Sequence, residues 1–134
     1  MKDINSLILG IDFDGTCVTH DYPNVGKDIG AQKVLKRLIQ NKHKLILHTM
    51  RSDINHIEDA ITWFMDNEIE LYGINKNREQ WVWTNSPKPH CNFYIDDAAI
   101  GTPLKFDINL SNRPFVDWGI IEIKLEQMGI LKND

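Results

Sequence analysis

The sequence has few cysteines and no long hydrophobic run. Its two cysteines, Cys17 and Cys91, lie far apart and outside any CxxC pattern, which argues against a disulfide framework or a zinc site. No apolar run approaches the ~20 residues that a membrane-spanning helix needs. Residues 1–15 contain acidic side chains and too short an apolar run for a signal peptide. These absences predict a reduced, cytoplasmic protein without a membrane partner.

Positive charge is also scarce. The chain has 15 Lys and Arg against 19 Asp and Glu, a net charge of −4. This argues against nonspecific nucleic-acid binding, because neutralising phosphates takes an excess of basic residues. The sequence contains no internal repeat, no low-complexity tract and no linker. We therefore expect a single domain over residues 1–134, long enough to bury a core.

Apolar runs alternate with helical periodicity along the chain, which predicts an α/β fold around a mainly parallel sheet. Helices are expected at three places, the second with its N-cap at Ser52 or Asp53 and the last between Asp117 and Gly129. The first two helices are expected to cover 29–41 and about 54–65, and the strands 7–11, 44–48, 69–74, 93–95 and 104–106.

The segment at 75–90 is expected to be irregular, since Pro87 and Pro89 exclude a helix there. Trp81 and Trp83 lie within it. We interpret both as packing residues, with lining of an open site as the alternative.

Acidic side chains follow the first predicted strand. Asp12 and Asp14 are two residues apart in extended chain, so they project to the same side, and Gly15 then allows a sharp turn. Neighbouring carboxylates at the edge of a core repel each other and resist burial. A bound cation or a proton relieves that cost, which indicates a site. A calcium loop is excluded, because its sixth and twelfth positions are Cys17 and Pro23 instead of Gly and Glu.

Polar side chains also follow the other central strands. Thr49 comes after the second predicted strand, and Asp96 and Asp97 come after the fourth. Lys88 lies in the loop just before the fourth strand. Ligands of parallel α/β sheets bind beyond the carboxyl ends of the strands. We therefore expect these groups to share a pocket with Asp12.

These residue types suit phosphoryl transfer. A carboxylate can form an acyl phosphate, acids from two strands can hold Mg²⁺, and Thr and Lys can bind phosphoryl oxygens. Some assignments stay open. Lys76 or Lys105 competes with Lys88 for the phosphate-binding role. Arg51 contacts either a substrate or a surface acid, and His20 is either a substrate contact or an exposed loop residue.

Four segments strongly resemble, in order and approximate spacing, the four motifs of the haloacid dehalogenase superfamily. They are LILGIDFDGT at 7–16, LILHT at 45–49, Lys88, and YIDD at 94–97, and together they span most of the chain. The resemblance implies a Rossmann-like three-layer sandwich and a Mg²⁺-dependent phosphatase that forms an aspartyl-phosphate. It disfavours dehalogenation, because an acid at the Asp14 position accompanies phosphatases and phosphotransferases.

The resemblance also implies a role for each acid. Asp12 would attack phosphorus and bind Mg²⁺. Asp14 would protonate the leaving group and then activate water, with its backbone carbonyl as a metal ligand. Asp96 would be the direct acidic metal ligand, and Asp97 would bind the metal directly or through water.

By the same resemblance, Thr49 and Lys88 would bind the phosphoryl group. The gaps between the motifs are too short for a sizeable cap domain, so the chain resembles a capless member. An open site of this kind suits a large phosphorylated substrate, or it is closed by a neighbouring subunit of a homo-oligomer. The loop at 18–27, expected beside Asp12, would then select the substrate.

Two other functions use the same groups without turnover. One is a phosphate-binding or receiver-like regulatory module. Receiver domains carry their adjacent acid pair at the first strand, however, whereas here the pair Asp96-Asp97 comes last. The other is a protein that has kept the fold and lost its activity, and nothing in the motif set supports such a loss.

Overall fold

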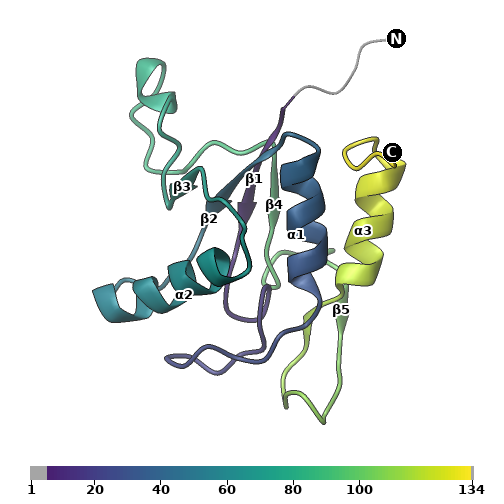
Figure 1. Ribbon diagram of the computed structural model, residues 1–134. Helices are drawn as coiled ribbons and strands as arrows, with labels where there is room; N and C mark the ends of the chain where they lie inside the picture. Colours follow the sequence, from purple (N-terminus) through teal and green to yellow (C-terminus); the bar gives the residue numbers. More distant parts are fainter. Residues whose placement is uncertain (1–5, 134) are drawn as a thin grey trace.

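A computed structural model describes residues 6–133; residues 1–5 and 134, which the one-domain prediction includes, lie outside the described residues. Figure 1 shows helices lying along a small central sheet. In chain order the elements are β1 (Ile8–Ile11), α1 (Ala31–Gln40), β2 (Lys44–Leu47), α2 (Ile54–Asp66), β3 (Gly73–Ile74), the 3-10 helix η1 (Gln80–Val82), β4 (Phe93–Ile95), β5 (Leu104–Lys105), β6 (Phe115–Val116) and α3 (Trp118–Gln127).

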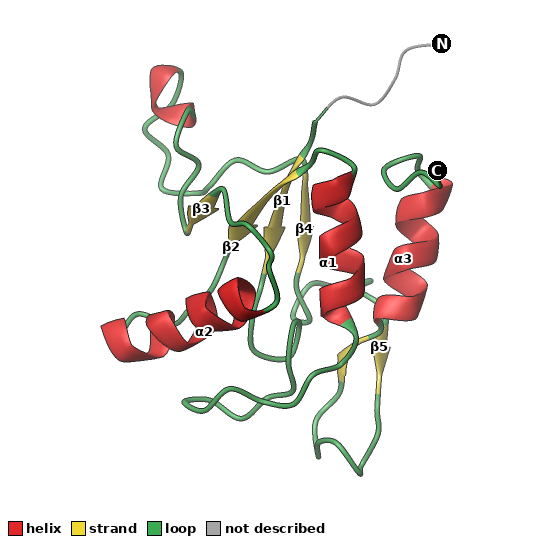
Figure 2. Ribbon diagram, viewed as in Figure 1, coloured by secondary structure: helices red, strands yellow, loops and turns green. Residues whose placement is uncertain are grey.

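The central sheet has four parallel strands in the order β3-β2-β1-β4. β5 and β6 form a separate antiparallel pair that projects from the body at the lower right of Figure 2. The predicted α/β fold with a mainly parallel sheet and no large additional domain is confirmed. β1 lies between β2 and β4, so the chain after β1 is at the centre of the sheet's carboxyl edge.

The main core lies on one face of this sheet. Leu9 and Ile11 of β1 point to that face, and buried side chains of all three α-helices join them in one hydrophobic cluster. On the opposite face a side chain at Gly10 would come within 3.0 Å of both Cys91 and Tyr94. The layers of the sandwich are therefore helices, sheet and the irregular segment that leads into β4.

The predicted strand at 69–74 is realised only at its end. The backbone N–H of Ile69 donates to Phe64, and Glu68 has a positive φ of 57°. These two features cap the C-terminus of α2. The first residues of the predicted strand therefore belong to the cap and to the chain that follows it, and β3 begins only at Gly73. The short strand β6 was not predicted. It pairs with β5, and residues 106–114 connect the two strands.

The packing role predicted for Trp81 and Trp83 is wrong, because their side chains are 73% and 64% exposed. Ile54 and Met65, at the two ends of α2, are also exposed. The caps of the helices agree better with expectation. Asp53 accepts from the N–H of Asn55, and the last helix begins after Asp117. Across residues 6–133, none of the helices combines the length and hydrophobicity required to cross a membrane.

Candidate active site

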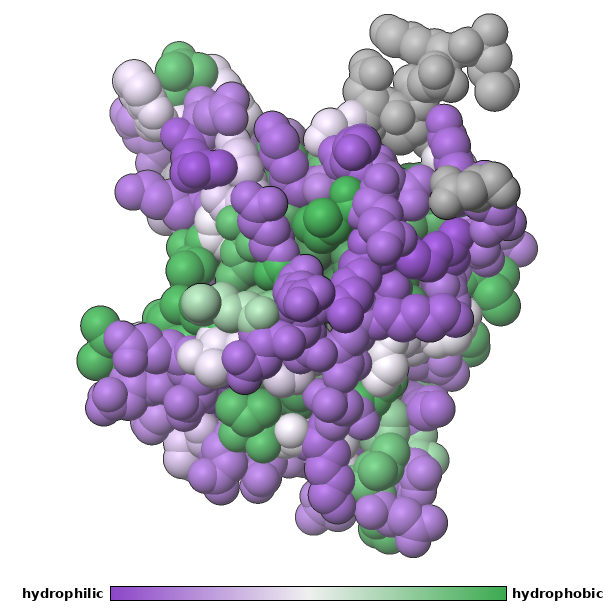
Figure 3. All heavy atoms as spheres, viewed as in Figure 1, coloured by the Kyte–Doolittle hydropathy of each residue, from purple (hydrophilic) through white to green (hydrophobic). Residues whose placement is uncertain are grey.

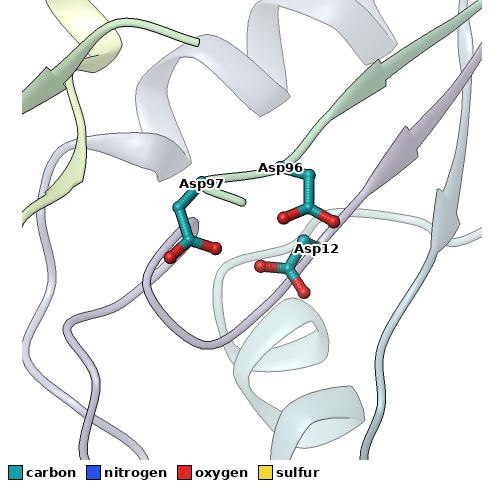
Figure 4. Close-up of side chains that lie close together, drawn as sticks. All are labelled: Asp12, Asp96 and Asp97. Carbon is teal, nitrogen blue, oxygen red and sulfur yellow. The ribbon is translucent and has the colours of Figure 1, made fainter. Parts of the chain in front are cut away.

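Three carboxylates meet at the carboxyl edge of the sheet (Figure 4). Asp12 directly follows β1, and Asp96 and Asp97 directly follow β4. The two strands are parallel and pair in register, so the N–H of Asp12 donates to the carbonyl of Ile95 at 3.0 Å. One oxygen of each acid lies within 4.8 Å of the others. The structure thus brings together the acids that the sequence placed at separate strand ends.

Thr16 connects the two strand ends. Its hydroxyl donates to Asp12 Oδ2 at 2.7 Å and accepts from the N–H of Asp97 at 3.0 Å. Its carbonyl accepts from the indole N–H of Trp118 at 2.6 Å, which anchors the turn against α3. Thr16 is fully buried. It was part of the quoted motif but had no predicted role, since only the folded chain shows which acids its hydroxyl reaches.

Within the described part of the chain, the acid cluster has a basic partner only at Asp97, which lies against His20. Within residues 6–133, no Lys or Arg forms an ion pair with Asp12 or Asp96. Burial, followed by the neighbouring charges of Asp96 and Asp97, raises the pKa of Asp12 from 3.8 to about 8, although the Thr16 hydroxyl opposes this. Three clustered carboxylate oxygens fit Mg²⁺, which prefers oxygen ligands.

His20 is held inside the site. Its Nε2 lies 2.7 Å from Asp97 Oδ2, and both side chains are largely buried. The interpretation of His20 as an exposed loop residue is therefore wrong. Gly15 makes room for this pair, since a Cβ there would lie 2.0 Å from His20 Nε2 and 2.5 Å from Asp97 Oδ2. Its φ of 82° independently favours glycine.

Asp14 lies apart from the three-acid cluster and binds Arg51. The guanidinium donates from Nε to Asp14 Oδ2 at 2.9 Å and from Nη2 to Oδ1 at 2.7 Å. Arg51 is only 2% exposed, and it stacks between Phe13 and Tyr22 at 5.0 and 5.1 Å from their ring centroids. Arg51 therefore pairs with an acid of the site and not with a surface acid, which was one of its two predicted partners. The other alternative, contact with a substrate, stays a prediction.

The same guanidinium organises the loop at 18–27. It donates to the carbonyls of Pro23 and Asn24 in the loop and of His56 in α2. Tyr22 adds a hydrogen bond to His56 Nδ1 at 3.1 Å. The loop is thus tied to α2 and to Asp14 through one buried side chain, which residue spacing alone does not reveal.

A cavity of about 270 Å³ opens beside Asp12, with Thr49 and Asp96 in its wall. Thr49 is 9% exposed, and its hydroxyl accepts from the N–H of Arg51 at 3.1 Å. Asn75 also lines the cavity and was missed by the sequence analysis. Its Oδ1 accepts from the N–H of Thr49 at 2.8 Å, and its φ of 52° is a conformation that asparagine tolerates better than most residues.

The structure does not bring the Lys88 ammonium to the acids. The flanking Pro87 and Pro89 line the cavity beside Asp12, but Lys88 Nζ lies 5.1 Å above the ring centroid of Tyr94. Of the two competing lysines, Lys105 is on β5 and Lys76 lines a different cavity. Phosphate binding by Lys88 stays a prediction, and it requires rotation of the side chain.

Together, fold and site define a small parallel α/β protein with an acidic cluster at the carboxyl edge of its sheet. The solved structure of a conserved protein coded by a locus from Bacteroides thetaiotaomicron is 33% identical in sequence. The match covers 92% of this chain and 93% of that chain, with a TM-score of 0.75. The chain belongs to the same family as this conserved Bacteroides protein. No family profile and no curated protein matches the sequence.

Proposed function

We propose that this protein is a Mg²⁺-dependent phosphohydrolase of the haloacid dehalogenase type, which acts in the cytoplasm through an aspartyl-phosphate on Asp12. The observation that carries the proposal is the cluster of Asp12, Asp96 and Asp97 beside the Thr49-lined cavity. A carboxylate nucleophile, oxygen ligands for a divalent cation and a hydroxyl for phosphate are what this reaction needs.

Asp12, Asp96 and Asp97 would hold the metal ion. When bound, Mg²⁺ would neutralise charge on the cluster and on the phosphoryl oxygens. Asp97 keeps its orientation through His20, at 2.7 Å, and through its own N–H on the Thr16 hydroxyl. The carboxylates are thus positioned by the fold before any ligand arrives.

In the first step an Asp12 carboxylate oxygen attacks phosphorus, and the bond from phosphorus to the leaving oxygen breaks. Thr16 donates to Asp12 Oδ2, which leaves Oδ1 as the candidate nucleophile. Thr49, and Lys88 after a side-chain rotation, would bind the phosphoryl oxygens. In the second step water attacks phosphorus, which releases inorganic phosphate and restores the Asp12 carboxylate.

Asp14 would give its proton to the leaving oxygen and take one from the attacking water. Both of its carboxylate oxygens are bound by Arg51 in this structure. Proton transfer therefore requires this ion pair to open, and the loop carbonyls that share Arg51 would have to move with it.

A phosphate-binding module without turnover is the second candidate. The observation that favours it is the placement of the two catalytic partners: Asp14 is locked to Arg51, and Lys88 lies over Tyr94. A chain fixed in this arrangement would bind metal and phosphate but would transfer no proton to a leaving group.

A phosphatase screen with Mg²⁺ or with EDTA separates the candidates, with the Asp12→Asn variant as its control. The proposal expects phosphate release that requires both Mg²⁺ and the Asp12 carboxylate. Mg²⁺ binding without turnover across a broad panel of phosphate esters would favour the binding module. Undiminished turnover by Asp12→Asn would sink the proposed mechanism.

A further inference from the structure

A second cavity adjoins the candidate active site. It has a volume of about 360 Å³ and lies within the segment between β3 and β4. Asn75, Pro87 and Pro89 line both this cavity and the one that contains Asp12. A molecule whose phosphate lies beside Asp12 can therefore extend past these three residues into the second cavity.

Trp81 of η1 lines the second cavity, and its indole is 73% exposed. The segment that carries it projects from the body at the upper left of Figure 1, and Figure 3 shows one small hydrophobic patch at its tip within a mainly hydrophilic surface. A large exposed aromatic side chain on a projecting segment is typical of a recognition surface. Trp83 is similarly exposed but packs edge-on against His90 at 5.5 Å and lines another cavity.

Gln80, the residue before Trp81 in η1, is 8% exposed and holds this part of the chain in place. Its side-chain amide donates to the carbonyls of Ser86 and Lys88 at 3.1 and 3.0 Å. Its Oε1 accepts from the N–H of His90 at 2.6 Å. These three hydrogen bonds fix η1 against the backbone of residues 86–90. Trp81 therefore projects from an ordered stretch of the chain.

The lining of the second cavity selects a class of ligand. Apart from Trp81 and the prolines it consists of amide and hydroxyl side chains with one cation, Lys76, and it contains no acid. The amides of Gln80 and Asn77 are occupied by bonds within the protein. The other polar side chains of the wall can hydrogen-bond a neutral polar group, and the wall has no acid to pair with a cationic one. The indole adds a flat face on which a ring can stack.

We propose that Trp81 and this second cavity bind the leaving group of an extended phosphate ester that ends in a neutral, hydrogen-bonding ring. This inference rests on the proposed phosphohydrolase function, which places the phosphate beside Asp12. Nucleoside monophosphates and disaccharide phosphates both have this chemistry. Glycerol phosphate lacks the ring and serves as the reference substrate.

The test compares kcat/KM for adenosine monophosphate, trehalose phosphate and glycerol phosphate in the parent, Trp81→Ala and Trp83→Ala. Trp81→Ala is expected to lower kcat/KM about tenfold for at least one ring-bearing ester, the usual loss for a removed stacking partner. The value for glycerol phosphate should not change, and Trp83→Ala should leave all three values unchanged. Equal losses on all three esters, or equal effects of both variants, would overturn the inference.

A binding measurement separates this inference from the proposed function. The indole N–H signals of isotope-labelled tryptophan are followed in the Asp12→Asn variant, and loss of a signal in each Trp→Ala variant assigns it among the four tryptophans. The Trp81 signal should move with a ring-bearing ester and stay in place with glycerol phosphate. Movement without turnover of any ester by the parent would overturn the function alone. Turnover without movement would overturn the ring site alone.

Discussion

Removing the Asp12 charge should stabilise the metal-free protein at alkaline pH. The pKa of Asp12 is raised from 3.8 to about 8 by burial and by the neighbouring acids. A raised pKa in the folded state means that folding takes up a proton, so stability is lost as pH rises towards 8. Asparagine keeps a similar shape without the charge. The Asp12→Asn variant should therefore gain on its parent as pH increases.

The size of the effect follows from the same pKa. Ionisation of Asp12 can lower the free energy of unfolding by at most about 4 kcal/mol between pH 5 and pH 8, because each pH unit contributes ~1.4 kcal/mol. Asp12 lines an open cavity and is only half-buried, so we take half of this ceiling, about 2 kcal/mol. The advantage of Asp12→Asn in the free energy of unfolding should grow by that amount from pH 5 to pH 8 and stay constant above.

Urea unfolding in EDTA measures this difference, with Asp14→Asn as the matched control. Asp14 is two residues away, but its carboxylate pairs with the buried Arg51. Asp14→Asn should lose about 3 kcal/mol, because it leaves a buried guanidinium without its counter-charge. A gain in unfolding free energy for Asp12→Asn at pH 8, together with a loss for Asp14→Asn, supports the account. A pH-independent difference for Asp12→Asn, or a loss that matches Asp14→Asn, would refute the reasoning about the acid cluster.

Other substitutions test the supports of the site. Arg51→Met should cost at least about 3 kcal/mol in unfolding free energy, because it leaves Asp14 without its counter-charge. Arg51→Lys should recover only part of this loss, since lysine lacks the bidentate fork. Full recovery with lysine would contradict the bidentate pairing. Gly15→Ala should cost clearly more than Gly101→Ala and should displace the ring signals of His20 in NMR spectra. Both glycines have positive φ, but only Gly15 has neighbours within 4 Å of an added Cβ, so equal costs would argue against the tight packing.

The sequence predicted the parts of the site that depend on strand ends. Asp12, Asp96 and Asp97 follow apolar runs, and parallel strands bring their carboxyl ends together, so their convergence could be expected. Arg51 could not be assigned in this way. Its partner Asp14 lies 37 residues earlier, and the pairing depends on how the loop at 18–27 folds over both.

Long-range contacts also explain the other differences. Asn75 contributes through one side-chain oxygen, which accepts from the N–H of Thr49, 26 residues earlier in the chain. The exposure of Trp81 could not be inferred, because aromatic residues next to valine are typical of both packed and projecting segments. The three hydrogen bonds of the Gln80 side chain fix the conformation of the segment that carries Trp81. These bonds could not be predicted, because the segment is irregular and its sequence has no helical or strand periodicity.

The central claim is that Asp12 becomes phosphorylated, and trapping the intermediate tests it most directly. The protein is mixed with an ester that it hydrolyses, with Mg²⁺ or EDTA, then acid-quenched and treated with borohydride, which reduces an acyl phosphate of aspartate to homoserine. Peptide mass spectrometry should find homoserine at position 12 only in the Mg²⁺ sample. Turnover without any modification at Asp12, or modification at Asp14 in its place, would contradict the account.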